Sequence, residues 1–141
     1  MRDLPRQLSV EELAELFEGR TRFVERLAQL EDPLGHAREV TASLSDEEKR
    51  AVLDAHPAIG ARRLSARSAA EQGSDEAPEL AALNRAYEAR FGFRFVVFVD
   101  GRPNSEIVGV LKERLERTRE QELATALDEL VAIAVDRWRR S

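Results

Sequence analysis

The 141-residue sequence contains no cysteine, one tryptophan and only two histidines. Without cysteine the chain has no disulfides and no thiolate metal sites, and two histidines are too few for us to expect a protein-ligated transition metal. The net charge of −5 disfavours nucleic acid as the main partner. Because the N-terminus lacks an apolar stretch and no run of eighteen apolar residues occurs, we expect no secretory leader and no membrane span, and we predict a cytoplasmic protein.

Hydrophobic residues make up 43% of the chain and charged residues 35%. This balance is typical of a soluble globular protein with a heavily solvated surface, and 141 residues suffice for one domain with its own core. We therefore predict a single domain over residues 1–141. Apolar residues recur at helical spacing through nearly all of it, which predicts an all-α bundle of about eight or nine helices.

Capping signals mark where these helices begin and end. Residues 9–12, 45–48 and 118–121 have the spacing of capping boxes, and Asp32 followed by Pro33 predicts a further start. The remaining boundary signals are Asn104 as an N-cap, Gly19 and Gly92 as C-terminal stops, a brief helix at about 65–72, and Pro78 in the first turn of the next helix.

Residues 93–99, Phe-Arg-Phe-Val-Val-Phe-Val, form the only strand-like run and have no partner strand in the chain. Their backbone groups still require hydrogen bonds. Three arrangements meet this requirement: an extended segment buried between helices, a strand completed across a dimer interface, or a platform whose free amides bind a substrate.

The residues with the greatest capacity for acid–base chemistry lie between positions 54 and 72. His56 precedes Pro57, and a residue before proline disfavours the α region, so a helix should stop near Ala55 with the imidazole at its end. Ser68, Glu71 and Gln72 share one helical face by their spacing. Each also has a structural interpretation, since His56 suits a helix C-terminus and the Ser68–Glu71 spacing fits a capping box.

Two further polar residues fall beside apolar stripes. Arg137 lies seven residues after Leu130 and four after Ile133, on the apolar face of the last helix. It either snorkels at the helix end or points inward, where a guanidinium suits a carboxylate-bearing substrate. Asn84 lies beside the stripe of the helix that begins near Pro78, and one interpretation is an amide that satisfies neighbouring backbone groups. His36 is expected to be a structural or surface histidine.

Three motifs then occur in order: His-Pro-Ala-Ile-Gly at 56–60, Ser-x-x-Glu-Gln at 68–72, and Leu-Asn-x-x-Tyr-x-x-x-Phe-Gly-Phe-x-Phe-Val at 83–96. Together with the helical pattern around them, they resemble the 2-oxo-4-hydroxy-4-carboxy-5-ureidoimidazoline (OHCU) decarboxylase family of urate degradation. The chain differs from the family pattern in its short connection at 73–78 and in Arg117, where an asparagine is common.

The resemblance implies a cofactor-independent carboxy-lyase that converts this ureidoimidazoline to (S)-allantoin, with a small-molecule substrate and a homodimeric assembly. It implies that His56 donates a proton and that Glu71 binds the ureido or ring N–H groups. The substrate-binding residues that it implies are Pro57, Ser68, Gln72, Val97, Phe98, Val99 and Arg137. Two alternatives remain open: a non-catalytic helical interaction module that docks through the apolar segment near Phe95, and a decarboxylase of a related hydantoin-like acid.

Overall fold

The computed structural model describes residues 3–57 and 79–140, and these residues form seven α-helices. The helices are α1 (Val10–Phe17), α2 (Arg22–Leu27), α3 (Pro33–Ser43), α4 (Asp46–Asp54), α6 (Glu79–Phe91), α7 (Asn104–Arg114) and α8 (Arg119–Arg140). Within those residues there is no β-strand, so the predicted all-α class is confirmed. The number of helices is slightly below the predicted eight or nine, and the brief helix expected at about 65–72 lies outside the described residues.

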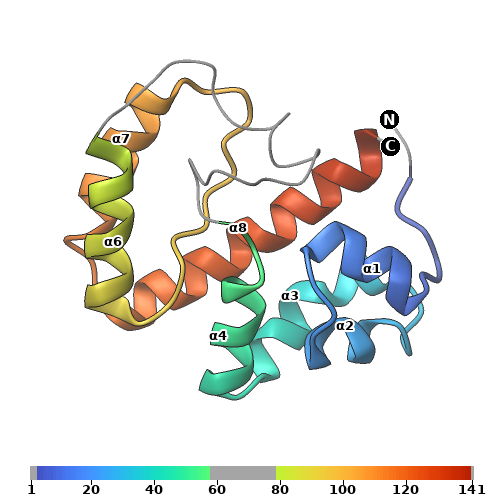
Figure 1. Ribbon diagram of the computed structural model, residues 1–141. Helices are drawn as coiled ribbons and strands as arrows, with labels where there is room; N and C mark the ends of the chain where they lie inside the picture. The colour runs from blue at the N-terminus through green and yellow to red at the C-terminus, as the bar shows by residue number, and fades with distance from the viewer. Residues whose placement is uncertain (1–2, 58–78, 141) are drawn as a thin grey trace.

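The longest helix, α8, crosses the molecule and organises it (Figure 1). Helices α1, α3 and α4 each pack directly on α8, while α2 packs against α1, α3 and α4. Helices α6 and α7 pack on each other near the N-terminal end of α8 (Figure 1). The first and last described residues belong to segments that lie close together, since the Trp138 indole N–H donates a hydrogen bond to the carbonyl of Asp3 at 2.8 Å.

The predicted helix starts reflect local hydrogen bonds. Ser9 with Glu12 and Ser45 with Glu48 form complete capping boxes, and Thr118 and Gln121 exchange the same two bonds at 3.1 Å. The Asp32 carboxylate accepts from the Gly35 amide with Pro33 in the first turn. These side chains satisfy amide donors that lack partners within their helices.

Two predicted boundaries are wrong by one residue. Helix α1 ends at Phe17, and Glu18, not Gly19, takes the left-handed conformation after it, with φ of 65°. Helix α7 begins at Asn104 itself, so that Pro103 occupies the N-cap position and the cap has no side-chain hydrogen bond. In contrast, Gly92 ends α6 with φ of 82°, as the sequence predicts.

The core lies along the inner face of α8 and includes the extended segment that follows α6. Its fully buried large side chains include Leu13, Phe23, Leu27, Leu53, Tyr87, Phe93, Phe95, Ile107, Leu111 and Leu130. A membrane-spanning helix needs a long apolar stretch, and none of the helices in the described residues has one.

Candidate active site

His56 lies just beyond the C-terminal end of α4, as the sequence predicts. The helix ends at Asp54, Ala55 caps it, and the His56 amide donates to the carbonyl of Leu53 at 3.1 Å. Pro57 follows and prevents the helix from continuing. The short, well-capped helix therefore presents the imidazole at a fixed point at its end.

Arg94 links this end of α4 to the extended segment at 93–99 through hydrogen bonds. Its Nη1 atom donates to the carbonyls of His56 at 2.6 Å and of Asp54 at 3.1 Å, while its amide donates to the Asp54 carboxylate at 3.1 Å. A guanidinium that binds the last carbonyls of a helix complements the negative end of the helix dipole. Arg94 thereby fixes the backbone that carries His56.

Arg137 points inward from α8, since only 2% of it is exposed. Its Nη1 atom lies 3.0 Å from Oε1 of Glu18 and donates to the carbonyl of Leu16 at 2.9 Å. The burial excludes the snorkelling interpretation and confirms the inward one. The C-terminal end of α1 thus holds the guanidinium.

The environment of His56 favours the neutral imidazole. Burial lowers its pKa from 6.5 to about 4, and the positive charges of Arg137 and Arg94 act in the same direction, while the Glu18 carboxylate opposes them. His56 is therefore uncharged at pH 7 in the free protein. Its Nδ1 atom is buried and has no hydrogen-bond partner among residues 3–57 and 79–140.

The extended segment is buried between helices, and side chains satisfy much of its backbone. Arg114 donates to the Val96 carbonyl at 2.8 Å, Arg102 donates to the carbonyls of Phe98 and Val99, and the Phe98 amide donates to Glu129 at 3.4 Å. This arrangement matches the first of the three that the sequence left open. The segment is not a β-strand, because side chains, and not the backbone of a neighbouring strand, form the hydrogen bonds to its amides and carbonyls.

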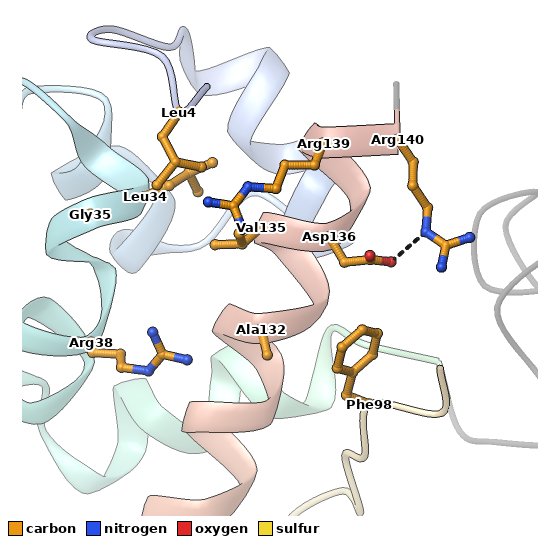
Figure 2. A pocket seen from close by; sticks show the side chains of 10 residues that line it. All are labelled: Leu4, Leu34, Gly35, Arg38, Phe98, Ala132, Val135, Asp136, Arg139 and Arg140. Carbon is orange, nitrogen blue, oxygen red and sulfur yellow. Dashed lines mark ion pairs between the residues drawn. The ribbon is translucent and has the colours of Figure 1, made fainter. Parts of the chain in front are cut away.

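Val97 and Val99 are buried, while the Phe98 side chain lines a groove of about 660 Å³ between α3, α8 and the N-terminal segment. Figure 2 shows Phe98 near Ala132 on α8, and the ion pair of Arg140 with Asp136 further along the same helix. Among the predicted site residues that the structure describes, Phe98 alone lines this groove. The predicted residues Ser68, Glu71 and Gln72 lie outside the described residues.

A buried charged network is the feature that the sequence interpretation missed. Glu122 is fully buried and accepts from the Tyr87 hydroxyl at 2.6 Å, from Arg114 Nε at 2.6 Å and from Arg117 at 3.0 Å. The Arg114 guanidinium also lies over the Phe95 ring, 4.6 Å from its centroid. Because Arg114 also holds Val96, the network supports the segment that continues to Val99. Its signal in the sequence was Glu122 itself, a charged residue four positions before the buried Ala126 on the apolar face of α8.

Within the described residues, no group of three or more His, Asp or Glu side chains could hold a metal ion. The arrangement therefore defines a helical protein in which a half-buried histidine after α4 lies within the electrostatic reach of a buried arginine on α8, which the end of α1 holds. The sequence profile of the OHCU decarboxylase family matches residues 2–139, and the chain belongs to that family.

Similar proteins carry related names. The 2-oxo-4-hydroxy-4-carboxy-5-ureidoimidazoline decarboxylase of Haloferax volcanii is 35% identical over 99 residues, which cover 64% of this chain and 59% of that protein. The uric acid degradation bifunctional protein of Bacillus sp. (strain TB-90) is 33% identical over 108 residues, 70% of this chain but 22% of that protein. The chain thus matches less than two thirds of the length of each of these relatives.

A crystal structure of OHCU decarboxylase in the presence of (S)-allantoin has the same fold. It superposes with a TM-score of 0.74 at 25% sequence identity, and the match covers 89% of this chain and 94% of that one.

Proposed function

We propose that this chain is a cofactor-independent decarboxylase that converts 2-oxo-4-hydroxy-4-carboxy-5-ureidoimidazoline to (S)-allantoin in urate degradation. The observation that carries the proposal is the position of His56 after α4, where the charge of the buried Arg137 on α8 lowers its pKa, in a chain of this family. A half-buried imidazole whose pKa is depressed, near a buried guanidinium, is typical of a site that handles a proton and an anion. A surface that only docks a partner does not need either group.

In the proposed complex, Arg137 holds an oxygen-rich part of the substrate and Glu71 binds its ureido or ring N–H groups. Hydrogen bonds from Ser68 and Gln72 hold the pose. Pro57 and the segment that contains Val97, Phe98 and Val99 line the remaining walls. Such positioning is a large part of catalysis when one face of a carbon must receive a proton.

The proposed reaction breaks the bond between the carboxylate and the carbon that also carries the hydroxyl. CO₂ leaves, the electron pair stays on that carbon, and a proton from His56 completes the product on a single face. The proton comes from solvent and reaches the carbon through the imidazole. His56 therefore fixes the handedness of the product.

The low pKa of His56 places a condition on this role. A proton donor must be protonated in the complex, whereas the free protein holds a neutral imidazole at pH 7. Burial and then the positive charge of Arg137 lower this pKa, and the negative charge of the bound substrate beside Arg137 offsets the second of these causes. Substrate binding thus raises the pKa of His56, and the enzyme takes up the proton when the substrate arrives.

Domain organisation, assembly and cellular location are also part of the proposal. We expect residues 1–141 to act as one decarboxylase domain, in a symmetric homodimer, in the cytoplasm. Sedimentation velocity at micromolar concentration distinguishes dimer from monomer, and a monomer alone would remove that part of the proposal without affecting the chemistry.

The direct test follows optical activity while the protein acts on freshly generated urate oxidation products. We expect rapid formation of the S enantiomer, whereas the uncatalysed decay gives a racemate. Protein dialysed against a strong chelator should retain full activity, and activity that returned only with a divalent metal would contradict cofactor independence. A parallel incubation with a related hydantoin-like acid tests the alternative substrate class, and preferential turnover of that acid would replace the proposed substrate.

A further inference from the structure

Glu18 occupies an unusual backbone position directly after α1. Its φ of 65° lies in the left-handed region, where a residue with a Cβ is uncommon and glycine is the usual choice. The next residue is Gly19, whose added Cβ would lie 2.9 Å from the Ala55 Cβ. The turn at Glu18 therefore brings the end of α1 against the end of α4, one residue before His56.

This turn also directs the Glu18 carboxylate to Arg137. The two charged groups lie 3.0 Å apart, and only 14% of the Glu18 side chain and 2% of the Arg137 side chain are exposed. The same Nη1 atom of Arg137 donates to the Leu16 carbonyl at 2.9 Å. Two acceptors on one short stretch of chain fix a planar guanidinium in one orientation.

We infer that Glu18 is a positioning residue of the active site, which holds the guanidinium of Arg137 in the orientation that receives the oxygen-rich group of the substrate. The inference rests on the proposed function, because it gives Glu18 its role through a substrate-binding Arg137. The left-handed conformation supports it, since strained non-glycine residues concentrate where a functional side chain must be aimed.

The electrostatics of the site agree with this geometry. The positive charges of Arg137 and Arg94 lower the pKa of His56, and the Glu18 carboxylate raises it. The Glu18 carboxylate therefore cancels part of the effect that the Arg137 charge has on the pKa of His56. An unpaired guanidinium at this position would make protonation of His56 harder.

Glu18→Gln tests the inference, because it keeps the length of the side chain and an acceptor oxygen but removes the charge. We expect KM to rise on the order of tenfold, as follows from the loss of a charge-assisted contact that serves binding, and kcat to fall by a smaller factor because protonation of His56 becomes harder. A variant that merely folded less completely would lower kcat through the active fraction and leave KM unchanged. Glu11→Gln is the matched control, since it removes the same charge from the exposed first turn of α1 and should leave both constants unchanged.

A readout independent of activity is the NMR spectrum of the arginine side chains. A fixed guanidinium shows separate Nη signals, and we expect those of Arg137 to merge in Glu18→Gln and to stay separate in Glu11→Gln. If Glu18→Gln does not fold, Glu18→Asp provides the second variant: it keeps the charge on a shorter side chain, so KM should rise and the Nη signals should broaden.

Unchanged KM and separate Nη signals in a folded Glu18→Gln would overturn the inference. The inference would also be overturned if Glu18→Gln raised KM by the same factor in Arg137→Met protein as in the wild type. A residue that acts only through Arg137 has no further effect once Arg137 is replaced. If the wild-type protein forms no allantoin, the proposed function fails, and the NMR comparison still decides whether Glu18 fixes Arg137.

Discussion

Glu122→Gln should be strongly destabilising, because Glu122 is the only carboxylate bonded to the buried guanidinium of Arg114 among the described residues. Glu122 is completely buried, and the Arg114 side chain is 6% exposed. The substitution keeps the shape of the side chain, so its cost is almost entirely electrostatic. The amide group would also direct N–H donors at one of its arginine partners, which are donors themselves.

Removal of one partner of a buried ion pair costs about 3–5 kcal/mol, because the other charge stays buried without compensation. Arg117 is 39% exposed and can regain water, which favours the lower end, about 3 kcal/mol. For 141 residues the unfolding entropy is about 0.3 kcal/mol per degree, so the melting temperature should fall by about 10 °C. This is a large fraction of a typical total stability of about 5–15 kcal/mol.

Urea unfolding and thermal melts followed by circular dichroism measure this loss. Glu113→Gln, which removes the same charge from an exposed position in α7, should change the unfolding free energy by less than about 0.5 kcal/mol. A loss below about 1 kcal/mol in Glu122→Gln would refute the reasoning, since it would mean that the Arg114 charge is well solvated or otherwise compensated.

Two further predictions concern the surroundings of His56. Since the pKa of His56 is about 4 in the folded protein and 6.5 when unfolded, only the unfolded state binds a proton between these values, and stability falls as the pH drops through that window. From pH 7 to pH 5 the wild type should lose about 2 kcal/mol more than His56→Asn in urea unfolding, and equal losses would contradict the depressed pKa. Gly19→Ala should cost about 1–3 kcal/mol and lower activity, because the new methyl would lie 2.9 Å from the Ala55 Cβ. Gly109→Ala, with no atom within 4 Å of its added Cβ, should instead be neutral or stabilising, and similar melts for both variants would show that the close approach is unimportant.

Local sequence signals predicted most of the helical framework. The capping residues Ser9, Ser45 and Thr118 act on backbone amides three residues away, so nothing distant is needed to place those helix starts. The end of α1 was misplaced by one residue because the position of Glu18 depends on Arg137, which lies far along the chain. Local propensity favours Gly19 for the left-handed position, and the tertiary ion pair explains why Glu18 occupies it.

The burial of a charged side chain was predictable where that residue broke an apolar pattern. Arg137 interrupts an apolar stripe, and it is buried as the inward interpretation requires. Glu122 interrupts the same helix in the same way, and its partners Tyr87 and Arg114 come from α6 and α7. Sequence spacing cannot indicate which helices bring these side chains together, because the pairing depends on how the helices pack. The depressed pKa of His56 was likewise unpredictable, since it results from burial and from arginines on two other segments.

The proposed chemistry depends on His56, so we would measure the rate of formation and the handedness of the allantoin that His56→Asn produces. The substitution replaces one polar side chain with another just beyond α4, so the fold should be retained. We expect the rate of (S)-allantoin formation to fall on the order of 10²–10⁴-fold, the usual contribution of a general acid. His36→Asn is the control, because His36 is half-exposed on α3 and its contact with Glu39 lies within one turn of that helix. Full, enantiospecific activity in a folded His56→Asn would contradict the account.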